Sequence, residues 1–154
     1  MRKLQEIIAY LCKNYPHKQE LSKARLTKLV YLADWFSAVS RKKQMSDITW
    51  LFNHYGPYVD DVIDSIRHDS NFSIAKDQNA YGSEKSVIIY KGNCEFKKLD
   101  SSDIRILDAI IEKTKTMYFN DFINYVYSTY PVRSKERYSS LDLVELAKKM
   151  DLEQ

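Results

Sequence analysis

Glycine and proline are scarce in this chain. Its 154 residues include three of each, whereas average composition would place about 12% of residues in these two types. A sandwich or barrel of many short strands needs more turn residues than this. The shortage excludes a β-rich fold and favours a mainly helical α+β domain. It also implies that each glycine or proline has a particular backbone role.

Long apolar runs are missing as well. No stretch approaches the roughly 18 apolar residues of a membrane-spanning helix. Residues 1–6 reach polar side chains at once and contain no signal-peptide apolar segment. We therefore expect a cytoplasmic protein without a membrane partner. The two cysteines, Cys12 and Cys94, lack metal-ligand spacing and are predicted to be buried thiols.

Sequence signatures of catalysis and cofactor binding are absent too. The chain has no phosphate-binding loop, dinucleotide-binding glycine pattern or nucleophile elbow. His17, His54 and His68 are not spaced as a metal pair on one helix. We expect no cofactor, no metal and no enzymatic activity. A hydrolase or nuclease whose site leaves no such signature is kept as a third alternative.

Charge is unevenly distributed, although the formal net charge is only +3. Residues 1–46 carry ten Lys or Arg against three Asp or Glu, whereas residues 47–84 carry two against seven. The contrast indicates internal pairing or a polar partner surface, and it is too diffuse to require nucleic acid. Twelve tyrosines dominate the aromatic residues, and tyrosine is enriched at protein interfaces.

Hydrophobic periodicity predicts one domain over residues 1–154, a compact helical domain with a small β-hairpin insertion. Helices are expected at residues 3–14, 23–40, 57–68, 103–116, 120–130 and 141–150, and hairpin strands at 72–75 and 87–90, with a loop through 81–83. The helix at 23–40 is apolar on most faces, so we expect it at the centre of the domain. The apolar and aromatic run at 48–55 predicts a strand or an extended segment.

Four single residues mark the expected ends of elements. Gly56 breaks the aromatic run, and Pro57 is expected in the first turn of the helix that follows, where its missing N–H costs nothing. Asn120 is a candidate cap for the helix at 120–130, and Pro131 is expected to stop it. A polar loop is expected at 133–138.

The helices at 103–116 and 120–130 together have the outline of a helix-turn-helix. The second would read DNA, but residues 121–126 contain no Lys or Arg. A reading helix normally supplies phosphate or base contacts. Simple helical packing is therefore favoured, and a nucleic-acid partner is not expected. A DNA-binding regulator of its own operon is kept as the main alternative.

Four aspartates need an explanation of their own. Asp34 stands in the most apolar helix with Ala38, not a cation, one turn later, so its carboxylate needs a donor elsewhere. A tertiary hydrogen bond and a contact with a partner are both open. Asp60, Asp61 and Asp64 form either a solvated helix face or a polar protein-binding edge.

Three segments resemble a known family. Residues 28–34 (Lys-Leu-Val-Tyr-Leu-Ala-Asp), followed by Trp35, resemble the central helix of the Panacea domain, the SocA-like or GepA-like phage-associated family. Trp50 and residues 52–59 (Phe-Asn-His-Tyr-Gly-Pro-Tyr-Val) resemble its aromatic approach to a Tyr-Gly-Pro turn. Residues 128–131 (Ser-Thr-Tyr-Pro) resemble its proline-containing segment before the last helix. The resemblance spans roughly residues 4–150.

The resemblance implies an antitoxin of a two-gene toxin–antitoxin system. Such a protein binds and neutralises a separate protein toxin, encoded beside it, and SocA-like members also deliver the toxin to a protease. We expect the toxin-facing surface around the Tyr-Gly-Pro turn, with Gly56 in a conformation that a larger residue resists. The expected partner-binding residues are Asp34, Trp50, His54, Tyr55, Gly56, Pro57, Tyr58, Asp60 and Asp61.

Overall fold

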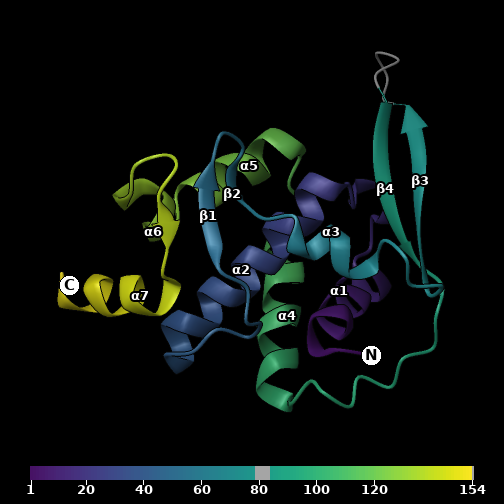
Figure 1. Cartoon of the computed structure of the whole chain (residues 1–154), viewed down its shortest axis with the longest axis horizontal. Coiled ribbons are helices and arrows are strands. Elements are labelled where there is room, and N and C mark those ends of the chain that lie inside the picture. Colours follow the sequence, from purple (N-terminus) through teal and green to yellow (C-terminus); the bar gives the residue numbers. More distant parts are fainter. Residues whose placement is uncertain (79–83, 154) are drawn as a thin grey trace.

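The computed structural model describes residues 1–78 and 84–153. Its helices are α1 (Lys3–Asn14), the short 3-10 helix η1 (Lys18–Glu20), α2 (Lys23–Arg41), α3 (Asp61–Ile66), α4 (Ser101–Thr114), α5 (Phe119–Tyr127), α6 (Tyr130–Ser134) and α7 (Leu143–Leu152). Its strands are β1 (Trp50–Asn53), β2 (Gly56–Tyr58), β3 (Phe72–Gln78), β4 (Glu84–Tyr90) and β5 (Ser140–Leu141). The predicted α+β fold, mainly helical with a small hairpin, is confirmed. The β3–β4 hairpin stands away from the helices, on the side opposite α7 (Figure 1).

Helix α2 occupies the centre, as its apolar faces predict. Ser22 begins the helix by accepting a hydrogen bond from the backbone N–H of Arg25 (3.1 Å), which is the usual role of an N-cap serine. Lys42 ends it in the left-handed conformation, with φ of 60°. Helices α1, α3, α4, α5 and α7 pack around it together with β2 and β4. Almost every face of α2 is therefore covered by the rest of the chain.

The aromatic run forms the middle of a three-stranded antiparallel sheet with the order β2–β1–β5. Phe52 pairs with Pro57, and Asn53 pairs with Gly56. The prediction that Pro57 opens a helix is therefore wrong. Pro57 lies in the edge strand β2. Proline is tolerated in an edge strand because its missing N–H can fall on the side that has no neighbouring strand. Helix α3 begins only at Asp61 and is shorter than expected.

The predicted hairpin is present and longer than its apolar residues indicate. Strands β3 and β4 pair from Phe72 opposite Tyr90 along their whole length. The loop expected at 81–83 lies outside the described residues. The hairpin is attached to the helices by the backbone N–H of Ile88, which donates to the carbonyl of Leu21 (2.9 Å) just before α2.

Helix α4 is fixed at its N-terminus by a buried carboxylate. Asp100 caps the helix by accepting from the Asp103 backbone N–H (2.7 Å). Asp103, which has no exposed surface, receives Arg41 Nη2 at 2.8 Å and Lys3 Nζ at 3.1 Å. Burial raises the pKa of the Asp103 carboxyl, but the Asp100 backbone N–H, Arg41 and Lys3 outweigh burial and lower that pKa below its usual value. This cluster joins α1, α2 and α4.

The boundaries of α5 and α6 differ from those expected. Helix α5 begins at Phe119 after Tyr118, so the prediction that Asn120 caps it is wrong. Pro131 does not stop a helix but lies in the first turn of α6. Proline suits that turn because its first N–H groups have no intrahelical acceptor. Part of the polar loop expected at 133–138 therefore belongs to α6.

The last helix begins two residues later than predicted. Leu141 belongs to β5, where it pairs with Trp50 of β1. Helix α7 starts at Leu143, after Asp142 accepts a hydrogen bond from the Glu145 backbone N–H (3.1 Å). Because β5 pairs with β1 and α7 packs on α2, the end of the chain completes the centre of the fold.

Candidate functional site

The turn between β1 and β2 presents two of the predicted partner-binding side chains to solvent. The side-chain carbonyl of Asn53 accepts the backbone N–H of Tyr55 (2.8 Å), and Gly56 follows with φ of +89°. Asparagine at the first turn position and glycine at the fourth are typical of this turn. His54 and Tyr55 occupy the tip, where Tyr55 is 68% exposed and its ring meets that of His54 edge to face, with centroids 5.1 Å apart.

Gly56 is restricted both by its backbone and by its surroundings. A Cβ atom built there would lie 2.9 Å from Tyr127 Cε1 and 3.1 Å from the Tyr127 hydroxyl oxygen. The Tyr127 ring is itself held edge to face against Phe52, with centroids 6.2 Å apart. The positive φ confirms the prediction that Gly56 adopts a conformation that larger residues resist.

A groove of about 540 Å³ lies beside the turn, bounded by α2, the β1–β2 hairpin and α5. We call it the α2–α5 groove. Its lining residues are Lys23, Ala24, Lys28, Asn53, His54, Tyr55, Tyr58, Phe119, Ile123 and Tyr127. Phe119, Ile123 and Tyr127 are spaced four residues apart and so share one face of α5. The groove thus has aromatic and apolar walls with lysines on one side.

Lys28 is unusual among the lining residues because it is only 2% exposed. Burial disfavours the charged form and lowers the pKa of its ammonium to about 8. Among residues 1–76 and 85–153 the ammonium finds neither an acceptor nor an acidic partner. The unpartnered polar atoms that are fully closed from solvent are Arg25 Nε and Thr27 Oγ1. Lys28 Nζ is not among them, and Lys28 lines the groove.

Asp34 lies in the interior and meets donors from the segment that leads into β1. Its carboxylate accepts Ser46 N at 2.7 Å, Ser46 Oγ at 2.5 Å and Trp50 Nε1 at 2.8 Å. Burial raises its pKa, and these hydrogen bonds oppose that rise. The tertiary hydrogen bond is therefore present, whereas a contact of Asp34 with a partner stays a prediction. In the chain alone neither Asp34 nor Trp50 has exposed surface.

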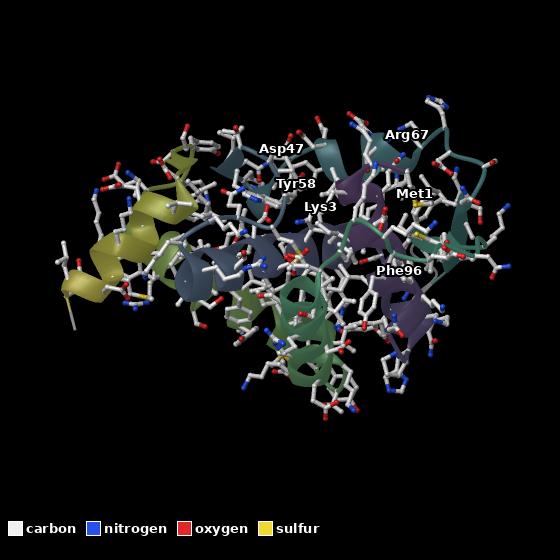
Figure 2. All side chains as sticks on the ribbon, turned by 90° about the horizontal axis from the view of Figure 1, so that it is seen from below. Met1, Lys3, Asp47, Tyr58, Arg67 and Phe96 are labelled. Carbon is white, nitrogen blue, oxygen red and sulfur yellow. The ribbon has the colours of Figure 1, made fainter. Side chains whose placement is uncertain are left out.

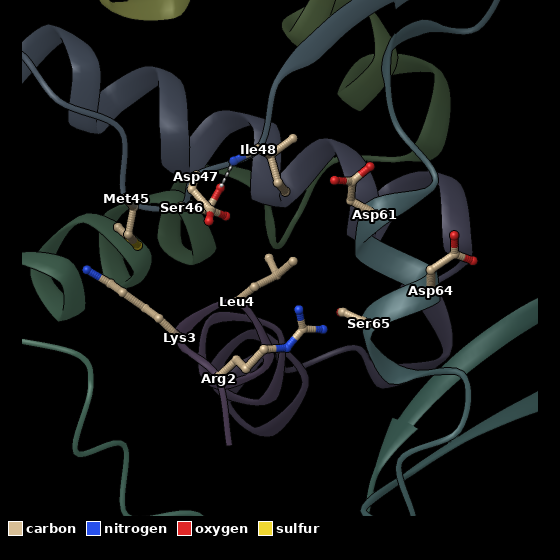
Figure 3. Close-up of a pocket in the computed structure, with 10 residues that line it drawn as sticks. All are labelled: Arg2, Lys3, Leu4, Met45, Ser46, Asp47, Ile48, Asp61, Asp64 and Ser65. Carbon is tan, nitrogen blue, oxygen red and sulfur yellow. Dashed lines mark hydrogen bonds between the residues drawn. The ribbon is translucent and has the colours of Figure 1, made fainter.

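Asp61 and Asp64 border a different cavity. A cleft of about 670 Å³ between the start of α1, residues 45–48 and α3 is lined by Arg2, Lys3, Leu4, Met45, Ser46, Asp47, Ile48, Asp61, Asp64 and Ser65. Figure 3 shows Leu4 in its middle and the Arg2 side chain extended toward Ser65. Figure 2 shows Lys3, Asp47 and Arg67 on this side of the molecule. We call it the α1–α3 cleft.

The predicted site therefore separates into four groups. His54, Tyr55 and Tyr58 line the α2–α5 groove, and Asp61 lines the α1–α3 cleft. Asp60 is exposed just before α3. Burial, followed by the nearby carboxylates of Asp60 and Asp64, raises the pKa of Tyr58. The buried group is Asp34, Trp50, Gly56 and Pro57.

Sequence reasoning missed two parts of the groove. The segment that resembles the family's central helix includes Lys28. That Lys28 is buried without an acidic partner cannot be read from the sequence. Simple packing is favoured for the helix predicted at 120–130, and Phe119, which begins α5, lies outside that range. Phe119, Ile123 and Tyr127 are spaced four residues apart. This spacing, which is additional to the buried stripe of Phe122 and Val126, could have indicated a second apolar face.

The predictions about cysteines, metal sites and membrane helices can be compared with the structure directly. Cys12 is buried, which raises the pKa of its thiol to about 12, whereas Cys94 is only half-buried and corrects that part of the prediction. Within the described ranges, no cluster of three or more His, Cys, Asp or Glu side chains could hold a metal ion. No helix in that part of the chain is long and apolar enough to cross a membrane.

Comparison with known proteins identifies a family. The family model described as "Antitoxin SocA-like, Panacea domain" matches residues 26–131. That segment runs from α2 to α6 and contains the β1–β2 turn and the whole lining of the α2–α5 groove except Lys23 and Ala24. Neither the curated proteins nor the solved structures gave a match.

Proposed function

This chain belongs to the SocA-like Panacea antitoxin family, and we propose that it neutralises a cognate protein toxin by binding it directly. The toxin is expected to be encoded in the neighbouring gene. The binding surface in this proposal is the β1–β2 turn together with the α2–α5 groove. The proposal needs no cofactor and no chemical step by the chain itself.

The observation that carries the proposal is the gathering of exposed rings at this surface. Tyr55 is 68% exposed and Phe119 is 44% exposed, although both border the same groove. Tyr118, directly before Phe119, is 83% exposed. Contiguous exposed apolar surface commonly marks a protein-binding site, and tyrosine supplies contact area with little loss of conformational freedom.

The buried residues of the predicted set hold this surface in place. Asp34 holds the segment that leads into β1, and Gly56 permits the turn to close against Tyr127. A surface that is fixed before binding loses less conformational entropy on association. DNA binding is less well supported, because α5 contains no Lys or Arg for phosphate contacts.

The direct test is growth rescue with the neighbouring gene. That gene is expressed from an inducible promoter, with and without this chain from a second promoter. We expect growth arrest from the neighbouring gene alone and normal growth when both are present. Copurification of the two proteins by size exclusion then tests whether neutralisation occurs through a complex. A neighbouring gene that is harmless, or arrest that the well-expressed chain does not relieve, contradicts the proposal.

Two variants locate the binding surface. Tyr55→Ala and Phe119→Ala should each weaken the complex by about tenfold, because each removes an exposed ring that binding would bury. Leu152→Ala is the matched control, since Leu152 is 86% exposed at the end of α7, which lies away from the groove (Figure 1). Equal loss in all three variants, or none in the two groove variants, would place the toxin elsewhere on the chain.

A further inference from the structure

We infer that the α2–α5 groove receives a segment of the partner protein that carries a carboxylate beside an apolar side chain, with the carboxylate pairing with Lys28. This inference rests on the proposed function and adds the chemistry of the partner. Aspartate or glutamate next to a large apolar residue, or a C-terminal carboxylate, would supply both groups.

The first support is that the Lys28 ammonium lacks a hydrogen-bond acceptor and a counterion. Lysine is almost never fully buried without a partner, because moving an unpaired charge out of water is unfavourable. Here Lys28 lines the groove, and its ammonium has neither an acceptor nor an acidic partner among the described residues. A carboxylate that entered the groove would provide the missing ion pair in a site already shielded from water, where such pairs are strongest.

The second support is the charge of the groove itself. The charged lining residues are Lys23 and Lys28, and no Asp or Glu lines it among the described residues. The other titratable lining groups are His54 and the phenols of Tyr55, Tyr58 and Tyr127. Among these groups, Tyr58 lies near two carboxylates, and its pKa is raised by burial and then by these carboxylates of Asp60 and Asp64. Neither aspartate lines the groove. The groove is therefore complementary to an anion.

The third support distinguishes a protein carboxylate from a phosphate. Lys28 is the one buried ammonium of the groove, and Lys23 is half-buried. The enclosed position therefore matches one negative charge, whereas phosphate sites usually combine several charged donors. Apart from Ala24 and Asn53, the remaining walls are rings and an isoleucine from α5, the turn and β2. These walls suit an apolar side chain that enters next to the carboxylate, as in peptide recognition by a helix-bounded groove.

The first experiment measures affinity for the purified product of the neighbouring gene. Lys28→Met keeps the length and apolar stem of the side chain and removes its charge, and Lys23→Met does the same at the edge of the groove. We expect Lys28→Met to weaken binding at least tenfold and Lys23→Met to weaken it less than threefold. Thermal melts confirm that both variants are folded.

The pH dependence separates a charge effect from a packing effect. Binding a carboxylate favours protonated Lys28, so wild-type affinity should fall at least fivefold between about pH 7.5 and pH 9.5, as the ammonium loses its proton. Lys28→Met should show less than half of that change, because Lys23, His54 and the groove phenols remain in both proteins. Equal affinity and equal pH profiles for wild type and Lys28→Met overturn the inference and leave the proposed function intact. A wild-type chain that does not bind the toxin overturns the proposed function itself.

A second experiment tests the groove without the toxin. The probes are 3-phenylpropionate and its uncharged analogue 3-phenylpropanamide, and the readout is the NMR signal of the Lys28 ε-methylene in the full chain. We expect the carboxylate to shift this signal and to raise the pKa of Lys28, and the amide to do neither. Equal effects of both probes, or no effect of either, contradict the carboxylate preference whatever the toxin does.

A second copy of this chain is the competing occupant. Sedimentation equilibrium of wild type and Lys28→Met tests it. A monomer in both cases supports the inference. A wild-type dimer that Lys28→Met dissociates would assign the groove to self-association and would overturn the assignment to a partner.

Discussion

Replacing Gly56 by valine tests whether the β1–β2 turn depends on its one left-handed residue. The φ of +89° disfavours any residue with a Cβ by about 1–2 kcal/mol, and more for a β-branched one. The added Cβ would also lie 2.9 Å from Tyr127 Cε1, and forcing extra atoms into a packed site typically costs about 1–3 kcal/mol. We therefore expect Gly56→Val to lower the free energy of unfolding by about 3 kcal/mol.

The two contributions can be separated with a second substitution. Tyr127→Ala removes the ring that the new side chain would meet, so the strain of the backbone alone should remain in the double variant. Urea denaturation, followed by far-UV circular dichroism, gives the free energy of unfolding of wild type, both single variants and the double variant. We expect the loss caused by Gly56→Val to be smaller by about 1–2 kcal/mol in the Tyr127→Ala background.

The same change should also weaken toxin binding, because the turn carries His54 and Tyr55. A chain of this size should lose roughly 6–12 °C in melting temperature for a 3 kcal/mol change, so binding is best compared at about 15 °C, where the variant is folded. If Gly56→Val loses less than about 0.5 kcal/mol and still neutralises the toxin, the role assigned to this turn is wrong.

Three further predictions concern buried charges. The pKa of Lys28, about 8, lies below its ordinary value of 10.5, so wild type gains stability as pH rises from about 8 to 10.5. Lys28→Met should therefore be more stable than wild type at pH 7 by up to about 3 kcal/mol, and chemical denaturation at pH 7 and pH 10 should show that difference shrinking. Asp34→Ala leaves Ser46 N, Ser46 Oγ and Trp50 Nε1 without their shared acceptor and should lower the free energy of unfolding by about 3–5 kcal/mol, with a changed Trp50 fluorescence spectrum. A loss below about 1 kcal/mol would refute this. The pKa of Asp103 is lowered by hydrogen bonds that include Arg41, so its contribution is present above about pH 4 and lost as pH falls through the lowered value. Asp103→Asn should be less stable than wild type at pH 7 and should lose less stability on acidification, which thermal melts from pH 7 to pH 3 would measure.

The helices with clear local signals were predictable from sequence. Helix α1 has the predicted bounds, and α2 differs by one residue, because apolar periodicity and the cap at Ser22 are properties of neighbouring residues. Pro57 and Pro131 were misplaced for a common reason. Proline is compatible with a helix N-terminus and with an edge strand, and only the pairing with β1 decides between them for Pro57.

The candidate site was predictable only in part. The turn residues His54 and Tyr55 are adjacent in sequence, and the glycine after them indicates where the chain reverses. The opposite wall of the groove comes from α5, whose Phe119 is distant in the chain, so the groove exists only after folding. Burial of Lys28 likewise depends on which elements cover α2, and no local pattern specifies that.

The arrangement of the strands bears on where the chain can be cut. The family match ends at residue 131 and begins at residue 26, yet α1, β5 and α7 lie beyond those limits and cover α2 and β1. A fragment restricted to residues 26–131 would leave β1 with an unpaired edge, which is a template for aggregation. The smallest piece that should fold alone therefore runs from α1 to α7, which is longer at both ends than the stretch by which the family is recognised.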